Sequence, residues 1–231
     1  MQRSLLPLAA VLVAFPLLWA CHRSGPDAPP PEVPALVQAA EIHARAGEHA
    51  AAAAAWRKVV AATPEDLDAR LSLGAQLWAA DQPEAAVTAY REAVQRAPHD
   101  ARAQGALGNA LREIQRPGEA LPSLQEAVAL EPNDARLRWE LGDVLLSLQR
   151  FPEAAEAFQR ALALDPDFPP AHYGQGLTRL RQNDRAGALS EYQWLKTHDP
   201  KLADALFDSY RRMRGFKTRR RHPPPPGSVP K

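Results

Sequence analysis

Small and large side chains recur with a period of 34 residues through the middle of the chain. In units of 34 residues counted from Val33, position 8 is small, position 20 is alanine and position 24 is a large apolar or aromatic residue. These residues are Ala40, Gly74, Gly108, Gly142 and Gly176; Ala52, Ala86, Ala120, Ala154 and Ala188; and Trp56, Tyr90, Leu124, Phe158 and Tyr192. Antiparallel helices approach closely only where small side chains meet, and a large side chain fills the space beside the crossing. Each unit is therefore predicted to be a pair of helices.

Proline marks the predicted ends of these helices. Position 32 of the five units is Pro64, Pro98, Pro132, Pro166 and Pro200. Proline lacks an N–H and disfavours helix in the preceding residue, so it is predicted to end each second helix. Pro83, Pro117 and Pro152 lie near the starts of second helices, where a missing N–H costs little. Pro122 would lie inside a second helix and is expected to kink it or delay its start.

A fixed period of this length is typical of stacked copies of one supersecondary unit. The units 33–66, 67–100, 101–134, 135–168 and 169–202 resemble the tetratricopeptide repeat (TPR) in their small, large and proline positions. The resemblance implies an all-α fold, a right-handed α-solenoid of five helix-turn-helix repeats. Residues 203–214, with Leu206, Phe207, Tyr210 and Met213, fit a helix that caps the last repeat. Another α-solenoid or a helical bundle is the alternative.

The N-terminal segment has the pattern of a secretion signal. Arg3 precedes an apolar run from Leu5 to Ala20, which is short for a membrane-spanning helix. The sequence Leu18-Trp19-Ala20-Cys21 resembles a bacterial lipobox, which implies cleavage before Cys21 and acylation of this cysteine. Residues 1–20 are then a lipoprotein signal peptide and the proline-rich residues 21–32 a lipidated tether. An uncleaved anchor with an incidental cysteine is the alternative.

The resemblance also suggests a location. In lipoproteins an Asp after the acylated cysteine favours the inner membrane, and here His22 follows Cys21. We therefore expect a lipid-anchored protein of the bacterial cell envelope, at the outer membrane and facing the periplasm. Cys21 is the only cysteine, so no intramolecular disulfide is possible.

Charge is distributed unevenly along the chain. Residues 21–210 carry a net charge of about −8, whereas residues 211–231 contain eight basic residues and no acidic one. The basic, proline-rich residues 215–231 are predicted to be disordered. This tail is a candidate for binding an anionic polymer or a lipid surface. Phe216 is its only aromatic residue, so sequence-specific binding of nucleic acid is not expected.

In TPR proteins the first helices line a concave face, and positions 2, 5, 9, 12 and 13 face the ligand. Transferred to this chain, these positions give Leu71, Trp78, Arg102, Asn109, Arg112, Arg136, Trp139, Asp143 and Tyr173. Aromatic and arginine side chains dominate binding energy at many interfaces. Arg102 and Arg136 are candidates to hold a carboxylate, with Trp139 stacking on apolar groups. The alternative is that the tryptophans pack between repeats and the arginines form a solvated face.

Some TPR proteins grip a C-terminal carboxylate with a clamp of Lys, Asn, Asn, Lys and Arg. Asn109 and Arg136 match two elements of this clamp, but Glu140 occupies the place of the last cation. Val37 and Glu41 do not supply the first pair. A carboxylate clamp is therefore not expected.

No pattern in the chain indicates catalysis. His43 and His49 are six residues apart, which does not place them on one helical face, and no cysteine joins them. We expect no catalytic, cofactor or metal site. The predicted function is a non-enzymatic scaffold that binds an extended or helical segment of another envelope protein. Lipid-anchored TPR proteins include pilotin-like factors in secretin and pilus-type assembly. The alternative is an anionic polymer or lipid-surface binder that acts through the basic tail.

Overall fold

The computed structural model describes residues 32–213, and their secondary structure is entirely helical. The helices are α1 (Val33–Arg45), α2 (His49–Ala62), α3 (Leu67–Ala79), α4 (Pro83–Arg96), α5 (Ala101–Glu113), α6 (Pro117–Leu130), α7 (Ala135–Ser147), α8 (Phe151–Leu164), α9 (Pro169–Arg181), α10 (Arg185–His198) and α11 (Pro200–Met213). This confirms the predicted all-α solenoid.

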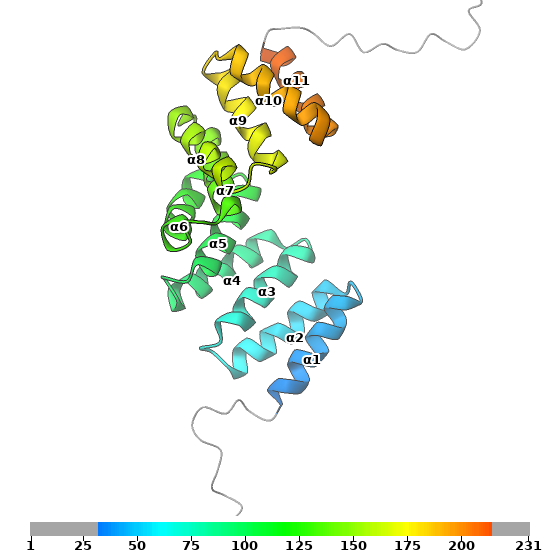
Figure 1. Cartoon of the computed structure of the whole chain (residues 1–231). Coiled ribbons are helices and arrows are strands. Elements are labelled where there is room, and N and C mark those ends of the chain that lie inside the picture. The colour runs from blue at the N-terminus through cyan, green and yellow to red at the C-terminus, as the bar shows by residue number, and fades with distance from the viewer. Residues whose placement is uncertain (1–31, 214–231) are drawn as a thin grey trace, which may run out of the picture.

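The helices stack in the order of the sequence. Each of the five units forms a hairpin of two helices, and the second helix of one hairpin packs against the first helix of the next. The hairpins run from α1–α2 at one end of the stack to α9–α10 near the other, where α11 follows (Figure 1). First helices also contact each other across neighbouring hairpins, α5 with α7 and α7 with α9. Side chains on adjacent first helices can therefore form a common surface.

The small residues at position 8 lie at the crossings of the helix pairs. A Cβ atom added to Gly74 would lie 2.4 Å from the ring of Tyr90, and one added to Gly142 would lie 2.8 Å from the ring of Phe158. The alanines at position 20 are all buried. In the last repeat, a Cβ on Gly176 would instead meet Leu206 of α11 at 2.6 Å. The predicted packing of small against large side chains is thus present.

Proline and aspartate together set the helix ends. Every second helix ends two residues before the proline at position 32 of its unit, as predicted. The aspartates at position 34 were not predicted as helix caps. Asp66, Asp100 and Asp134 are the N-caps of α3, α5 and α7, and each accepts hydrogen bonds from backbone N–H groups of the first turn. Such a cap contributes about 1 kcal/mol to stability.

A further contact joins neighbouring units at these loops. Gln104, Arg138 and His172 all stand at position 4 of their units. A side-chain nitrogen of each lies within hydrogen-bond distance of the backbone carbonyl of the proline six residues earlier, at 2.8, 2.8 and 2.9 Å. Three different side chains thus contact the equivalent loop carbonyl in three successive repeats.

Pro122 does not delay the start of its helix. α6 contains 14 residues and begins at the same position of its unit as the other second helices, so a delayed start is excluded. Proline removes one backbone hydrogen bond, but most helical stability in proteins comes from tertiary packing. Ala120 and Leu124 on either side of Pro122 are fully buried, which holds this turn in place.

The capping helix begins earlier than expected. α11 starts at Pro200 rather than at residue 203, because proline suits the first helical position and Asp199 accepts a hydrogen bond from the N–H of Leu202. The proposed signal peptide, Cys21, the tether up to residue 31 and the tail after Met213 lie outside the described residues. Within residues 32–213, no helix is long and apolar enough to span a membrane.

Candidate binding groove

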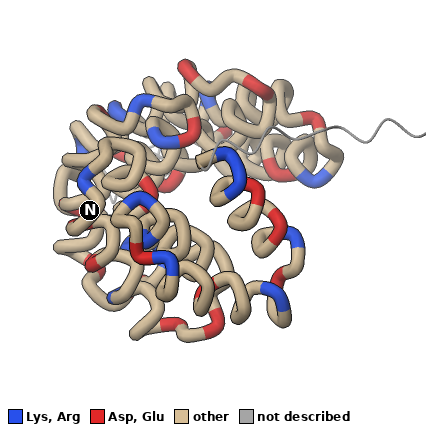
Figure 2. The backbone as a smooth tube through the Cα atoms, turned by 90° about the horizontal axis from the view of Figure 1, so that it is seen from above, with Lys and Arg blue, Asp and Glu red and all other residues tan. Residues whose placement is uncertain are grey.

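The predicted groove residues all lie on first helices and all are at least partly accessible to solvent. Leu71 and Trp78 belong to α3; Arg102, Asn109 and Arg112 to α5; Arg136, Trp139 and Asp143 to α7; and Tyr173 to α9. Basic and acidic residues are interspersed along the whole stack (Figure 2). The chemistry of the groove therefore depends on how individual side chains pair.

Arg112 is the centre of a cluster that joins α5 to α7. Its guanidinium donates to Asp143 Oδ2 at 2.8 Å and to Asn109 Oδ1 at 2.8 Å, and it also contacts Glu113. The guanidinium lies 4.9 Å from the centre of the Trp139 ring. Because the Arg112 side chain is only 15% exposed, such a cation–π contact contributes on the order of 1–2 kcal/mol. The structure thus brings together four of the predicted residues, with Arg112 as the group that orders the other three.

Trp139 also links this cluster to the next repeat. Its ring meets the ring of Phe168 edge to face, with centroids 5.8 Å apart. Trp139 packs against the core cluster of Ala154 and Phe158 but remains half-buried. The tryptophan therefore packs between repeats on one side and keeps an accessible part on the other.

Arg102 and Arg136 are engaged by acids of the chain itself. Arg102 donates to Asp68 at 2.8 Å and to Asp100 at 3.1 Å, while Arg136 donates through Nε to Glu140 at 3.0 Å. Both arginines were predicted to be candidates for holding a ligand carboxylate. Arg102 and Asp68 stand at position 2 of adjacent units, so the alignment of repeats carried a signal for this pair.

Glu140 is the buried acid of the groove. It is 2% exposed, and burial raises the pKa of its carboxyl although Arg136 and Arg112 oppose this rise. It stands where the carboxylate clamp of other TPR proteins has a cation. Because Glu140 pairs with Arg136, it also reduces the positive charge that a ligand carboxylate would meet.

Hollows lie between the adjacent first helices. One of about 400 Å³ is lined by Arg102, Asn109 and Arg136, by the acids Glu131, Asp134 and Glu140, and by Leu137 and small side chains of α5. A second, of about 510 Å³, lies where the loops before α7 and α9 meet, and is lined by Arg136 and Phe168 with the acids Glu131, Asp134 and Asp165. Arg136 lines both, and its side chain is 70% exposed. This residue is therefore the most accessible cation at the centre of the groove.

A third hollow continues the row toward α9. It measures about 410 Å³ and is lined by Asp143, Leu146, Leu177 and Arg181 among others. Leu146 and Leu177 give it apolar walls, and neither was among the predicted residues. The three hollows together span α5, α7 and α9.

The remaining predicted residues belong to other parts of the stack. Leu71 and Trp78 pack half-buried against a core cluster that extends from the first repeat to the fourth, and Tyr173 packs against the core beside α11. The two histidines considered for a metal site contact different residues, His43 with Glu48 and His49 with Gln76. Among residues 32–213, no group of three or more His, Cys, Asp or Glu is arranged to hold a metal ion.

Comparison with known proteins agrees with this geometry. The family model of the tetratricopeptide repeat matches residues 37–101, 73–135 and 106–169, which together cover more than half of the chain. A search of curated proteins found no significant match.

Two solved structures illustrate the likeness in fold. MamA from Desulfovibrio magneticus RS-1, residues 41 to the end, is similar to this chain with 22% identity and a TM-score of 0.71 over 75% of this chain and 98% of that one. YrrB, described as a TPR protein with an unusual peptide-binding site, shares 23% identity with a TM-score of 0.65 over 75% of this chain and 90% of that one. At these identities the likeness shows the fold.

Proposed function

Because the chain belongs to the tetratricopeptide repeat family, we propose that it is a non-enzymatic scaffold that binds a segment of a protein partner. Members of this family are mainly scaffolds that bind other proteins. The observation that carries the proposal is the row of hollows along α5, α7 and α9, which are lined by arginine and asparagine side chains next to apolar and acidic ones. The peptide-binding site named for YrrB supports the same class of ligand.

Arg136 is the residue we propose to anchor the partner. A guanidinium has five N–H donors, and among the described residues only Glu140 accepts from this one, through Nε. The two terminal nitrogens remain able to hold a carboxylate of the partner bidentately. Trp139 supplies a flat apolar surface beside it. Arg112 fixes this surface through Asn109 and Asp143, so the groove needs little rearrangement on binding.

We further propose that the scaffold is anchored through acylated Cys21 in the bacterial envelope, at the outer membrane and facing the periplasm. The lipobox-like sequence that ends at Cys21 supports this location. The partner would then be another envelope protein, in secretin, pilus-type or general envelope assembly.

Site-specific crosslinking in intact cells tests the groove. A photoreactive amino acid in place of Trp139 is expected to yield an adduct with a partner, identifiable by mass spectrometry. The same substitution at Gln159, which is exposed on the second helix α8, serves as the control. Arg136→Gln in the Trp139 variant should reduce the adduct, whereas deletion of residues 215–231 should not. Loss of the adduct on deletion of the tail alone would favour binding through the basic tail.

Cell fractionation tests the anchor. Cys21→Ser should yield a chain that is no longer recovered with membranes, because the acyl chains supply the anchoring free energy. His22→Ser, which changes the neighbouring residue, should remain with membranes. If Cys21→Ser fractionates like the wild type, the apolar run of residues 5–20 itself anchors the chain and acylation is not needed.

A further inference from the structure

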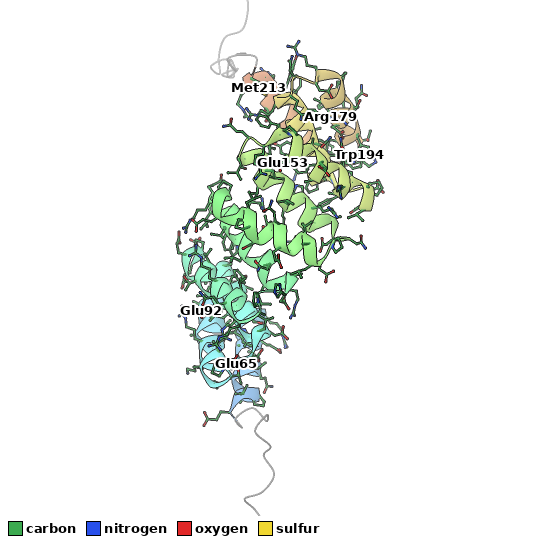
Figure 3. The ribbon with its side chains drawn as sticks, turned by 90° about the vertical axis from the view of Figure 1, so that its left-hand side faces the viewer. Glu65, Glu92, Glu153, Arg179, Trp194 and Met213 are labelled. Atoms are coloured by element: carbon green, nitrogen blue, oxygen red, sulfur yellow. The ribbon has the colours of Figure 1, made fainter. Side chains whose placement is uncertain are left out.

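An apolar hollow lies at the C-terminal end of the stack, away from the groove of α5 and α7. It has a volume of about 260 Å³, and we call it the C-terminal hollow. Its lining comes from α9, α10 and α11: Leu180, Arg185, Ala188, Leu189, Tyr192, Leu206, Phe207 and Tyr210. Figure 3 shows this end of the molecule, where Met213 ends α11.

The walls of the C-terminal hollow are accessible apolar side chains. Leu189 is 54% exposed and Phe207 is 47% exposed, although both are large and hydrophobic. Phe207 lies beside Tyr192, with ring centroids 6.0 Å apart, and Leu206 and Ala188 are buried beneath them. Earlier second helices are covered by a following hairpin, whereas α10 is followed within the described chain by the single helix α11. The hollow is thus open where the stack ends.

Among residues 32–213, Arg185 is the only charged residue that lines this hollow. No ion pair or hydrogen bond joins its guanidinium to another residue between 32 and 213. Arg102, Arg112 and Arg136 of the central groove differ in this respect, because each of these three pairs with an acid of the chain. Asp184, next to Arg185, is occupied as the N-cap of α10 and by Arg179. A second cation, Arg211, lies 5.9 Å from the ring of Phe207.

We propose that the C-terminal hollow docks a short acidic and apolar segment of a protein partner. A leucine or phenylalanine of this segment packs between Leu189 and Phe207, and an adjacent carboxylate pairs with Arg185. Charge complementarity favours this occupant. The guanidinium of Arg185, which has no partner among residues 32–213, lies beside the apolar side chains that line the hollow. The tail that follows Met213 carries basic side chains and no acidic side chain, so it offers no side-chain carboxylate to pair with Arg185. This surface is independent of the central groove.

Fluorescence anisotropy with the full chain tests this proposal. The probe is the fluorescein-labelled peptide Gly-Glu-Leu-Phe-Glu-Gly amide, and its matched control has glutamine in place of both glutamates. We expect the glutamate peptide to bind about fivefold more tightly, as for an accessible ion pair of about 1 kcal/mol. Arg185→Gln should remove this difference between the two peptides. Leu189→Asp should abolish binding of the glutamate peptide, and Arg160→Gln on the exposed face of α8 should leave it unchanged.

Several outcomes would overturn the proposal. Equal affinity of the two peptides for the wild type would remove the role of the carboxylate. Wild-type binding by Leu189→Asp, or loss of binding in Arg160→Gln alone, would place the peptide elsewhere. Tighter binding after deletion of residues 215–231 would identify the tail as occupant, and a dimer lost in Leu189→Asp would identify a second copy. Phe207→Ser is the second variant if Leu189→Asp lowers the melting temperature.

Discussion

Phe158 is held between two glycines, which makes the crossing of the fourth repeat a sensitive test of the packing. Its side chain is fully buried. A Cβ atom on Gly142 of the same repeat would lie 2.8 Å from one part of the ring. A Cβ on Gly174 of the following repeat would lie 2.4 Å from Cζ. Because glycine stands next to the ring in both neighbouring first helices, the ring has little room to move away from an added methyl group. Gly174→Ala should therefore destabilise the stack.

The size of this effect follows from two opposing contributions. Overpacking a well-filled core costs about 1–3 kcal/mol, and contacts this short belong at the upper end of the range. Alanine in place of glycine inside a helix contributes about 1 kcal/mol in the other direction. The expected net loss in the free energy of unfolding for Gly174→Ala is therefore about 2 kcal/mol. In a chain of this size such a loss lowers the melting temperature by about 4–8 °C.

Thermal and urea unfolding followed by circular dichroism would measure this change. Gly118→Ala is the matched control, because a Cβ there has open space within 4 Å and should raise stability by about 0.5 kcal/mol. In a Phe158→Leu background the smaller side chain leaves room for the added methyl group. Gly174→Ala should then lower the free energy of unfolding by less than about 1 kcal/mol. A wild-type melting temperature for Gly174→Ala would show that the ring does not clash with the added methyl group. An equal loss of unfolding free energy in the wild-type and Phe158→Leu backgrounds would show the same.

Three further predictions test other features. Ala154→Leu, at a fully buried crossing, should reduce the free energy of unfolding by about 3 kcal/mol, whereas Ala163→Leu on an exposed face of the same helix should change it little in urea titrations. Burial raises the pKa of Glu140 above its usual 4.5, with Arg136 opposing, so the folded chain retains a proton that the unfolded chain releases. Wild-type stability should therefore fall relative to Glu140→Gln as the pH rises from about 4.5, and a difference independent of pH would contradict this. Asp134→Ala should lose about 1 kcal/mol through the N-cap of α7; unchanged urea unfolding would show that the cap contributes nothing.

The fold could be predicted because its main constraint is steric and repeats within every unit. Gly142 and Phe158 are informative in the sequence alone, since only a small residue fits against a ring at a crossing of two helices. Asp100 is an example of a helix-start signal that is present in the sequence and was not part of the prediction. An aspartate immediately before an expected first helix is a common N-cap, and it recurs here with the same period.

The pairing of the groove side chains was harder to predict. Arg102 and Arg136 were expected to face a ligand, yet both contact acids of the chain. Long side chains reach several partners, so their pairing depends on torsion angles that a position in a repeat does not determine. Arg185 was overlooked for a related reason, because it lies on a second helix, outside the positions that the family pattern assigns to ligands.

The loop contacts have a consequence for how this array can change in length. The junction between two units takes only seven residues. Pro98 ends one helix, Asp100 caps the next, and Gln104 donates a hydrogen bond to the carbonyl of Pro98. If recombination excised residues 101–134, Asp100 would directly precede Ala135, and the contact made by Arg138 would pass to the carbonyl of Pro98. Because these junctions are interchangeable, a gene can gain or lose whole hairpins while both ends of the protein stay the same. The distance that the array spans can therefore change in evolution by one hairpin at a time.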